Sequence, residues 1–348
     1  MTKIKVGILG ATGMVGQRFV ELLQTHPWFE INELAASEKS AGKTYEEAIQ
    51  GRWKVSSDIP ESVRKIKIKE CTPNLDCKII FSALDSSVAG PIEEEFAKNG
   101  YVVSSNSKNH RMDEDVPLLI PEVNSEHLSI IKKQKKRFGK GFIVTNPNCS
   151  IIGLVMALKP LYDSFRLKKV FVTTMQALSG AGYPGVASLD ILDNVVPYIG
   201  QEEEKIETES LKILGKIKNK KFEYSGIKFS AQCNRVNVKD GHLETVNVEI
   251  DKKAEIEEIK KSFRNFNPLK GLKLPSAPNP PIIVREEIDR PQPKYDRDAK
   301  NGMAVTVGRI RKCNILDYKF LVLSHNTIRG AAGAAILNAE LMKVKGMV

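Results

Sequence analysis

The sequence predicts an α/β protein of two domains: a first domain built on a parallel sheet, and a second, α+β domain built on a mostly antiparallel sheet. Three observations lead to this fold class. The chain has 348 residues, which is enough for two domains of ordinary size. Short apolar strands alternate with helical patterns up to residue 148, and longer strands follow beyond residue 165.

The first domain is predicted from short apolar strands, most of them followed by a helical pattern. Strands are expected at residues 4–9, 31–36, 78–83, 101–104 and 142–145, and helices at 14–24, 88–98 and 125–135. Strands that alternate with helices form a parallel sheet whose faces the helices cover. We therefore expect residues 1–148 to form one domain.

The second domain is predicted from a change of rhythm along the chain. Strands are expected at 168–178, 227–236, 242–250, 304–310 and 319–324, and helices at 186–198, 202–217 and 254–265. The proline-rich stretch 274–284 cannot be helical and is expected to run over the surface. An alanine-rich helical pattern covers 327–345. We expect residues 326–348 to complete the first domain and residues 149–325 to form the catalytic and dimerisation domain.

The composition is that of a globular protein, with 41% hydrophobic and 27% charged residues. No apolar run approaches the roughly 20 residues that span a bilayer, and the N-terminus has no apolar signal core with a cleavage site. The five cysteines are dispersed, without a CxxC pair or a histidine at metal-ligand spacing. We expect a cytoplasmic protein with no membrane or metal partner.

The charge balance is basic, with 53 Lys and Arg against 42 Asp and Glu, a net +11. The lysines are scattered, and only residues 132–137 form a block, which is typical of a solvated helix end. A general positive field attracts small polyanions such as phosphorylated cofactors and substrates. We therefore expect a small-molecule substrate and no nucleic acid.

A glycine pattern follows the first strand directly. Gly10, Gly13 and Gly16 stand where that strand ends and a helix begins. Glycines in this context let the backbone turn tightly and approach a pyrophosphate, which the free N–H groups and the dipole of the helix N-terminus hold. The pattern predicts a Rossmann-type dinucleotide site. A tight turn without a ligand is the alternative.

The end of the second strand favours NADP over NAD. Ser37 stands where an NAD-binding fold would place a carboxylate for the ribose. Ser37, Lys39 and Ser40 offer hydroxyls and an ammonium to a 2′-phosphate. Glu38 would weaken or reverse this preference if its side chain pointed inward. An ordinary polar loop is the alternative interpretation.

Cys149 lies between an Asn-Pro-Asn corner and an apolar run of helical spacing. It is either a small buried hydrophobe or a nucleophile at the start of a helix, whose N-terminus would lower the pKa of the thiol. Its position at the junction of the two predicted domains favours the nucleophile, because ligand sites collect in such clefts.

A thiolate beside a nicotinamide implies a thioester, a thiohemiacetal and hydride transfer between them, which requires a base and a group that holds the substrate. His242 is the best base, since it opens a strand after the turn 239–241; a structural imidazole is the alternative. Arg235 lies seven residues earlier and could bind a carboxylate through two parallel hydrogen bonds from its guanidinium. Strand parity alone does not place the two side chains on one face.

Several motifs together resemble the aspartate-semialdehyde dehydrogenase family, in its archaeal and fungal branch. They are GATGMVG, SNSKNHRMD, TNPNCS, QALSGAGYPG, CNRVNVKDGHLE and HNTIRGAAG, which run from residue 10 to residue 333. The resemblance implies reduction of L-4-aspartyl phosphate by NADPH to L-aspartate 4-semialdehyde through a cysteine thioester, a step toward lysine, threonine, methionine and isoleucine.

The resemblance also implies roles for single residues. Cys149 is the acyl-thioester nucleophile and His242 the acid/base. Gln176 would orient the acyl group, and Arg235 would bind the α-carboxylate. The other substrate-binding residues, for the amine and the phosphate, are Glu209, Lys212, Arg111 and Asn109. The NADP-binding residues are Gly10, Thr12, Gly13, Met14, Val15, Gly16, Ser37, Lys39, Ser40, Ser82, Leu84, Ser179, Gly180 and Asn326.

Alternatives remain for the substrate residues. Glu209 and Lys212 lie three apart and so share a helix face, but the pair could be solvated. Arg111 could be a surface cation. The sequence departs from the family pattern at Asn237, where proline is expected, which should affect strand rigidity more than chemistry.

Three other functions are alternatives. A malonyl- or succinyl-CoA reductase shares the scaffold but tends to lose the Asn-Pro-Asn before the cysteine. An N-acetylglutamyl-phosphate reductase needs a Gly-Cys-Tyr-Pro setting that is absent. A non-catalytic NADP- or RNA-binding protein has no need of Cys149, His242 and Arg235 together. We also expect a homodimer or homotetramer, because a sheet with helices on one face needs a partner for the other.

Overall fold

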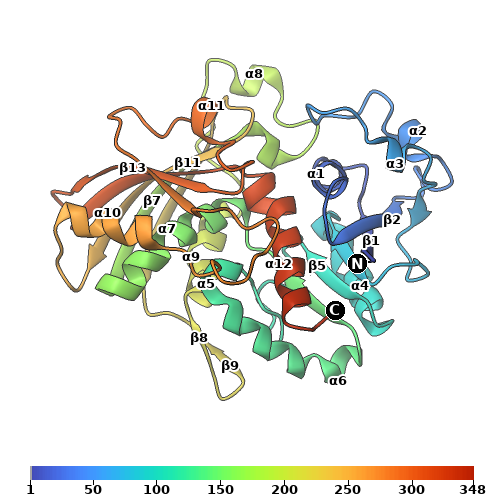
Figure 1. Ribbon diagram of the computed structural model, residues 1–348. Coiled ribbons are helices and arrows are strands. Elements are labelled where there is room, and N and C mark those ends of the chain that lie inside the picture. The colour runs from blue at the N-terminus through green and yellow to red at the C-terminus, as the bar shows by residue number, and fades with distance from the viewer. Residues whose placement is uncertain (1) are drawn as a thin grey trace.

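The computed structural model describes residues 2–348 and contains two large sheets (Figure 1). The chain passes from the first sheet to the second through helix α7 (Cys149–Phe165), which is apolar on nearly all sides and buried. The predicted fold class is therefore confirmed: a Rossmann-like parallel sheet and a second, mixed sheet with helices.

The first sheet has six parallel strands in the order β3-β2-β1-β4-β5-β6. They are β1 Ile4–Leu9, β2 Phe29–Ala36, β3 Lys69–Glu70, β4 Ile79–Ser82, β5 Val102–Ser105 and β6 Phe142–Thr145. Of these strands only β3 was not predicted, because it is an exposed edge strand of two residues without an apolar signal. The strand order reverses between β1 and β4, and ligands bind at the carboxyl ends of the strands at such a point.

The helices of this half are α1 Met14–Leu23, α2 Tyr45–Ile49, α3 Glu61–Arg64, α4 Ser86–Lys98, α5 Pro121–Asn124 and α6 Lys135–Phe138. The helix predicted at 125–135 differs, because Ser125–Lys133 forms a 3₁₀ helix. Its buried residues His127, Leu128, Ile130 and Ile131 form pairs three apart, which matches the three-residue repeat of that helix.

The last helical segment returns to the first sheet. A π-helical turn at Ile328–Ala332 leads into α12 (Gly333–Val344), which packs beside β5 and β4. Ser104 on β5 donates from its hydroxyl to the carbonyl of Ala335 at 3.2 Å. Arg329, fully buried, donates to both oxygens of Glu122 at 2.8 and 2.7 Å. In Figure 1 this red helix lies between the two sheets.

The second sheet has six strands in the order β10-β7-β11-β14-β13-β12. They are β7 Leu167–Gln176, β10 Lys228–Arg235, β11 His242–Ile250, β12 Ile282–Arg285, β13 Val305–Lys312 and β14 Tyr318–Ser324. The outer pairs β10–β7 and β12–β13 are parallel and the three inner pairs are antiparallel. A separate hairpin, β8 (Lys216–Lys218) and β9 (Lys221–Glu223), was not predicted.

The helices of this half are η2 Leu178–Ala181, α8 Ser188–Ile191, α9 Glu202–Ile213, α10 Ile256–Asn265 and α11 Pro293–Asp296. The helix predicted at 186–198 is wrong beyond its first turn. Asp193 has a positive φ of 56° and the backbone of Val196 pairs with Arg235, so this segment joins the edge of the sheet instead. The proline-rich stretch 274–284 overlaps the start of β12.

One face of the second sheet packs against α7 and α10, and the other lacks such a cover within residues 2–348. Alternate residues of β11 are buried and half-buried, and Phe171 on β7 is 39% exposed. No helix in the described part of the chain combines the length and apolar character that a bilayer crossing requires.

Candidate active site

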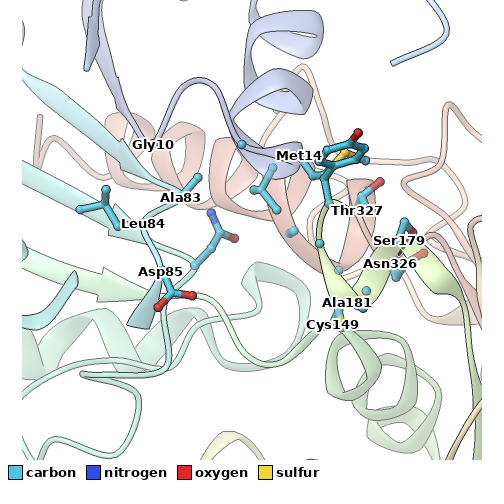
Figure 2. A pocket seen from close by; sticks show the side chains of 18 of the residues that line it. Gly10, Met14, Ala83, Leu84, Asp85, Cys149, Ser179, Ala181, Asn326 and Thr327 are labelled. Atoms are coloured by element: carbon cyan, nitrogen blue, oxygen red, sulfur yellow. Dashed lines mark hydrogen bonds between the residues drawn. The ribbon is translucent and has the colours of Figure 1, made fainter. Parts of the chain in front are cut away.

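A cavity of about 650 Å³ lies where the two halves meet. The glycine loop after β1, the ends of β4 and β5, the start of α7 and the segment 179–183 all contribute to its lining. Figure 2 shows Gly10, Ala83 and Leu84 toward one end of this cavity and Cys149, Ser179 and Asn326 toward the other. It runs from the predicted cofactor loop to the predicted nucleophile.

The glycine loop is shaped by steric necessity at two positions. Gly10 has φ +74°, and a Cβ there would lie 2.6 Å from the carbonyl oxygen of Ala83. A Cβ on Gly16 would lie 2.2 Å from the carbonyl oxygen of Gly10. Only glycine fits these close approaches. The loop therefore brings backbone N–H groups to the cavity at the N-terminus of α1, the geometry that binds a pyrophosphate.

Most of the predicted cofactor residues meet at this cavity. Those in its lining are Gly10, Thr12, Gly13, Met14, Val15, Ser37, Leu84, Ser179, Gly180 and Asn326. Lys39 lines an adjoining cavity of about 570 Å³ together with Ser37 and Glu38. Gly16, Ser40 and Ser82 lie behind these surfaces and do not line either cavity. Glu38 and Lys39 thus both line the cavity of about 570 Å³ that adjoins the glycine loop's cavity.

Cys149 and His242 are brought together from different elements. Cys149 is the first residue of α7, His242 the first of β11, and Sγ lies 3.3 Å from Nε2. The amide N–H of Ala177 donates to Nδ1 of His242 at 3.0 Å. Since Nδ1 accepts this bond, the proton of a neutral ring is on Nε2, facing the sulfur.

The electrostatics correct one expectation. Burial, followed by the charge of Glu202, raises the pKa of Cys149 to about 12, although Arg235, Arg111 and Lys205 act in the opposite direction. The lowering of this pKa that we expected from the helix N-terminus is therefore wrong, because desolvation outweighs it. Burial, with Arg235 and His325, lowers the pKa of His242 to about 3. The resting pair is a thiol and a neutral imidazole.

Arg235 reaches the same end of the cavity as His242, which strand parity had left open. Its Nη1 donates to the carbonyl of Ala177 at 2.8 Å. A Cβ on Gly180 would lie 2.9 Å from Arg235 Nη1 and 3.2 Å from His242 Cε1. The absence of a side chain at Gly180 therefore leaves room beside both groups.

Arg111 and Glu209 form a buried pair rather than surface charges. Nη1 of Arg111 donates to Oε1 of Glu209 at 3.0 Å. The other oxygen of Glu209 accepts from the backbone N–H of Asn148 at 2.9 Å. Arg111 lines the cavity, so this network connects the loop after β5 to the residue before the nucleophile.

Lys212 and Asn109 do not line the cavity. The ammonium of Lys212 is fully buried and donates to the carbonyls of Arg111, Asp113 and Val116 at 2.7, 2.8 and 2.9 Å. Burial lowers its pKa to about 8. Asn109 donates from its amide to the carbonyl of Ser86 at 3.0 Å. Both residues support the loop that carries Arg111.

Sequence reasoning missed Glu202 and Lys205, which also surround the site. Glu202 accepts from Asn148 Nδ2 at 2.9 Å and from Gln176 Nε2 at 3.3 Å, and Lys205 Nζ donates to it at 2.7 Å. The sequence gives little signal, because Glu202 opens a run of three glutamates of which only this one is buried.

Comparisons with known proteins agree with this geometry. Residues 5–131 match the model "Semialdehyde dehydrogenase, NAD binding domain" and residues 158–329 match "Semialdehyde dehydrogenase, dimerisation domain". The chain is 55% identical over 342 residues to aspartate-semialdehyde dehydrogenase of Archaeoglobus fulgidus, covering 98% of each chain. It is 47% identical over 367 residues to that of Candida albicans, covering 100% of each.

Two solved structures are also similar. The Candida albicans enzyme with NADP superimposes with a TM-score of 0.92 at 44% identity over 100% of both chains. An aspartate semialdehyde dehydrogenase II from Vibrio cholerae gives 0.78 at 27% identity, over 99% of each chain. The similarity therefore extends over both halves of the chain and the cleft between them.

Proposed function

The chain belongs to the aspartate-semialdehyde dehydrogenase family, and from this membership we propose that it reduces L-4-aspartyl phosphate to L-aspartate 4-semialdehyde with release of phosphate. The observation that carries the proposal is the 3.3 Å approach of Cys149 Sγ to His242 Nε2 at the end of a dinucleotide-shaped cleft. The product is a precursor for lysine, threonine, methionine and isoleucine.

The residues of the cleft fit NADP. Backbone N–H groups at the start of α1 suit its pyrophosphate, and the residue directly after β2 is Ser37 rather than an acidic residue. Lys39 supplies a positive charge beside Ser37 for a 2′-phosphate. When bound, NADPH supplies the hydride that reduces the thioester carbon. We propose NADP as the cofactor.

Cys149 is the proposed nucleophile. Its sulfur attacks the acyl carbon, the bond from that carbon to the phosphate oxygen breaks, and a thioester forms. The leaving phosphate takes the proton that the thiol gives up. After reduction, the carbon–sulfur bond breaks to release the aldehyde. His242 is the proposed acid/base, because its Nε2 lies beside the sulfur. In the neutral ring Nε2 carries the proton, so His242 acts first as a hydrogen-bond donor to the sulfur.

The substrate groups find partners of opposite charge. Arg235, beside the nucleophile's base, is the proposed ligand of the α-carboxylate, and Arg111 that of the phosphate. Glu209 is the proposed partner of the amine. Gln176 orients the acyl group, and Lys212 and Asn109 serve the phosphate by shaping the loop that carries Arg111.

We also propose a homodimer formed through the uncovered face of the second sheet. The matched dimerisation model spans residues 158–329, and this face carries the exposed side chain of Phe171. Sedimentation velocity of the purified chain distinguishes this dimer from a tetramer. All five cysteines are free, which supports a cytoplasmic location.

The test uses the purified full chain with aspartate semialdehyde, inorganic phosphate and NADP, following the absorbance of the reduced nicotinamide. We expect turnover that Cys149→Ala lowers by at least about a thousandfold, whereas Cys313→Ala leaves it unchanged. The variant should still bind NADPH. Turnover that needs CoA in place of phosphate, or that survives Cys149→Ala, would contradict the proposal.

A further inference from the structure

Glu202 connects three groups around the nucleophile. It is the first residue of α9, it is 6% exposed, and both of its oxygens accept from Asn148 Nδ2 at 2.9 Å. Gln176 Nε2 donates to it at 3.3 Å, and Lys205 Nζ at 2.7 Å. This carboxylate therefore touches the acyl-orienting amide and the residue that precedes the nucleophile.

The bonds to Glu202 fix which way two amides face. A carboxylate only accepts hydrogen bonds, so the nitrogen of Gln176 must point toward Glu202. The same nitrogen donates to the hydroxyl of Thr174 at 3.4 Å. Both N–H groups of Gln176 are thus engaged, and its carbonyl oxygen is the polar atom left for the substrate.

Asn148 is held at both ends of its amide. Its nitrogen donates to Glu202, and its oxygen accepts from the N–H of Ser150 at 3.0 Å as the cap of α7. Cys149 lies between Asn148 and Ser150 in the chain, so a movement of Asn148 would move the backbone that carries the sulfur.

The structure assigns Glu202 as a positioning residue: it holds Gln176 with its carbonyl oxygen toward the substrate and anchors the Asn148 cap of the nucleophile's helix. This inference rests on the proposed function for the identity of the substrate. It goes beyond that function because Glu202 touches no reacting atom and acts through Gln176 and Asn148.

Glu202 has two opposing effects on the reaction: its hydrogen bonds place Gln176 and Asn148, whereas its negative charge makes the thiol of Cys149 harder to ionise. After burial, it is the largest contribution that raises the pKa of the thiol, and Lys205 partly offsets it. Removing the charge should therefore make the thiol easier to ionise while it disorders Gln176. A residue with a merely structural role would not change these two properties in opposite directions.

The experiment measures both properties in the full chain. Alkylation of Cys149 by iodoacetamide, followed by mass spectrometry of its peptide, reports the thiol without substrate or cofactor. Steady-state turnover reports the chemistry. The variants are Glu202→Gln, Glu202→Asp and, as a control, Glu204→Gln, which removes an exposed charge from the same first turn of α9.

We expect Glu202→Gln to alkylate about three- to tenfold faster near neutral pH and to turn over at least about tenfold more slowly. Glu202→Asp keeps the charge but is too short for all three bonds, so alkylation should stay within about twofold while turnover falls. Glu204→Gln should match the wild type in both measurements.

Wild-type turnover by Glu202→Asp, or alkylation that slows in Glu202→Gln, would overturn the inference. If Glu202→Gln does not fold, Glu202→Asp decides alone. If the wild type itself shows no turnover with aspartate semialdehyde, the proposed function fails, and the alkylation rates still test whether Glu202 acts on Cys149.

Discussion

Arg111 and Glu209 form a buried ion pair with a 3.0 Å bond, and the pair joins the loop after β5 to helix α9. Both side chains are buried, at 7% and 3% exposure. Removing one member of such a pair leaves an uncompensated charge and costs about 3–5 kcal/mol, far more than an exposed pair. The pair therefore serves both stability and the placement of the proposed phosphate ligand.

Arg111→Lys should weaken phosphate binding while it keeps the charge. The planar guanidinium of Arg111 donates to Glu209 and to the carbonyl of Asn106 at the same time. A lysine ammonium lacks this geometry, so it would not be held in the same position in the cleft. We expect the KM for phosphate in the oxidative direction to rise about tenfold or more, with a smaller change for aspartate semialdehyde. Arg264→Lys, an exposed change, is the control. Equal effects on both substrates would contradict the assignment.

Lys212→Met should destabilise the protein, because it leaves three buried carbonyls without their donor. Each unpaired buried group costs about 1–3 kcal/mol, so the free energy of unfolding should fall by at least about 3 kcal/mol in urea. Lys216→Met, at an exposed position, should change it little. If Lys212 instead contacts phosphate directly, Lys212→Met would raise the KM for phosphate with almost no loss of stability.

His242 should make stability depend on pH on the acid side. Its pKa falls from near 6.5 in the unfolded chain to about 3 on folding, so its contribution is complete above pH 6.5 and is lost as the pH falls toward 3. Between pH 7.5 and 5 the wild type should lose about 2 kcal/mol more than His242→Asn. Urea denaturation at the two pH values measures this. Equal losses of unfolding free energy in the wild type and in His242→Asn would show that His242 is not buried in its neutral form.

Lys39 and Glu38 should set the choice of cofactor in opposite directions. Lys39→Met should lower the affinity for NADP about tenfold and leave that for NAD unchanged, since only NADP carries the 2′-phosphate. Glu38→Gln should increase the preference for NADP modestly. Fluorescence titration at low and moderate salt measures both constants. A loss of NAD affinity in Lys39→Met would place the lysine on a shared part of the two cofactors.

The parts of the fold that the sequence predicts well are those where local pattern and tertiary packing agree. Strands 4–9 and 142–145 are apolar, short and bounded by turns, and their predicted limits match β1 and β6. The segment 186–198 has a helical pattern too, but Val196 pairs with the backbone of Arg235, and this long-range bond overrides the local preference. A single sequence does not contain that information.

The same distinction applies to the site. Cys149 and His242 could be predicted because a thioester route requires a thiol and a base, and the chain offers few of either. The direction of the shift in the pKa of Cys149 could not, since it depends on how deeply the sulfur is enclosed and on Glu202, which lies 53 residues away in sequence. Likewise, the spacing of Glu209 and Lys212 predicts that both lie on one helix face. It does not predict that the Lys212 side chain donates to the carbonyls of the loop 111–116.

The position of α12 has a consequence for how the protein is made. Ser104 and Ala335 are 231 positions apart, and Glu122 and Arg329 are 207 apart, yet both pairs lie in the core beside the first sheet. A ribosome therefore exposes the strands of the nucleotide-binding half long before the helix that covers them. During that interval the half-built sheet keeps an apolar surface open, and the second domain is synthesised completely in the meantime. Helix α12 therefore covers the first sheet only after the strands of that sheet and the whole second sheet have been synthesised.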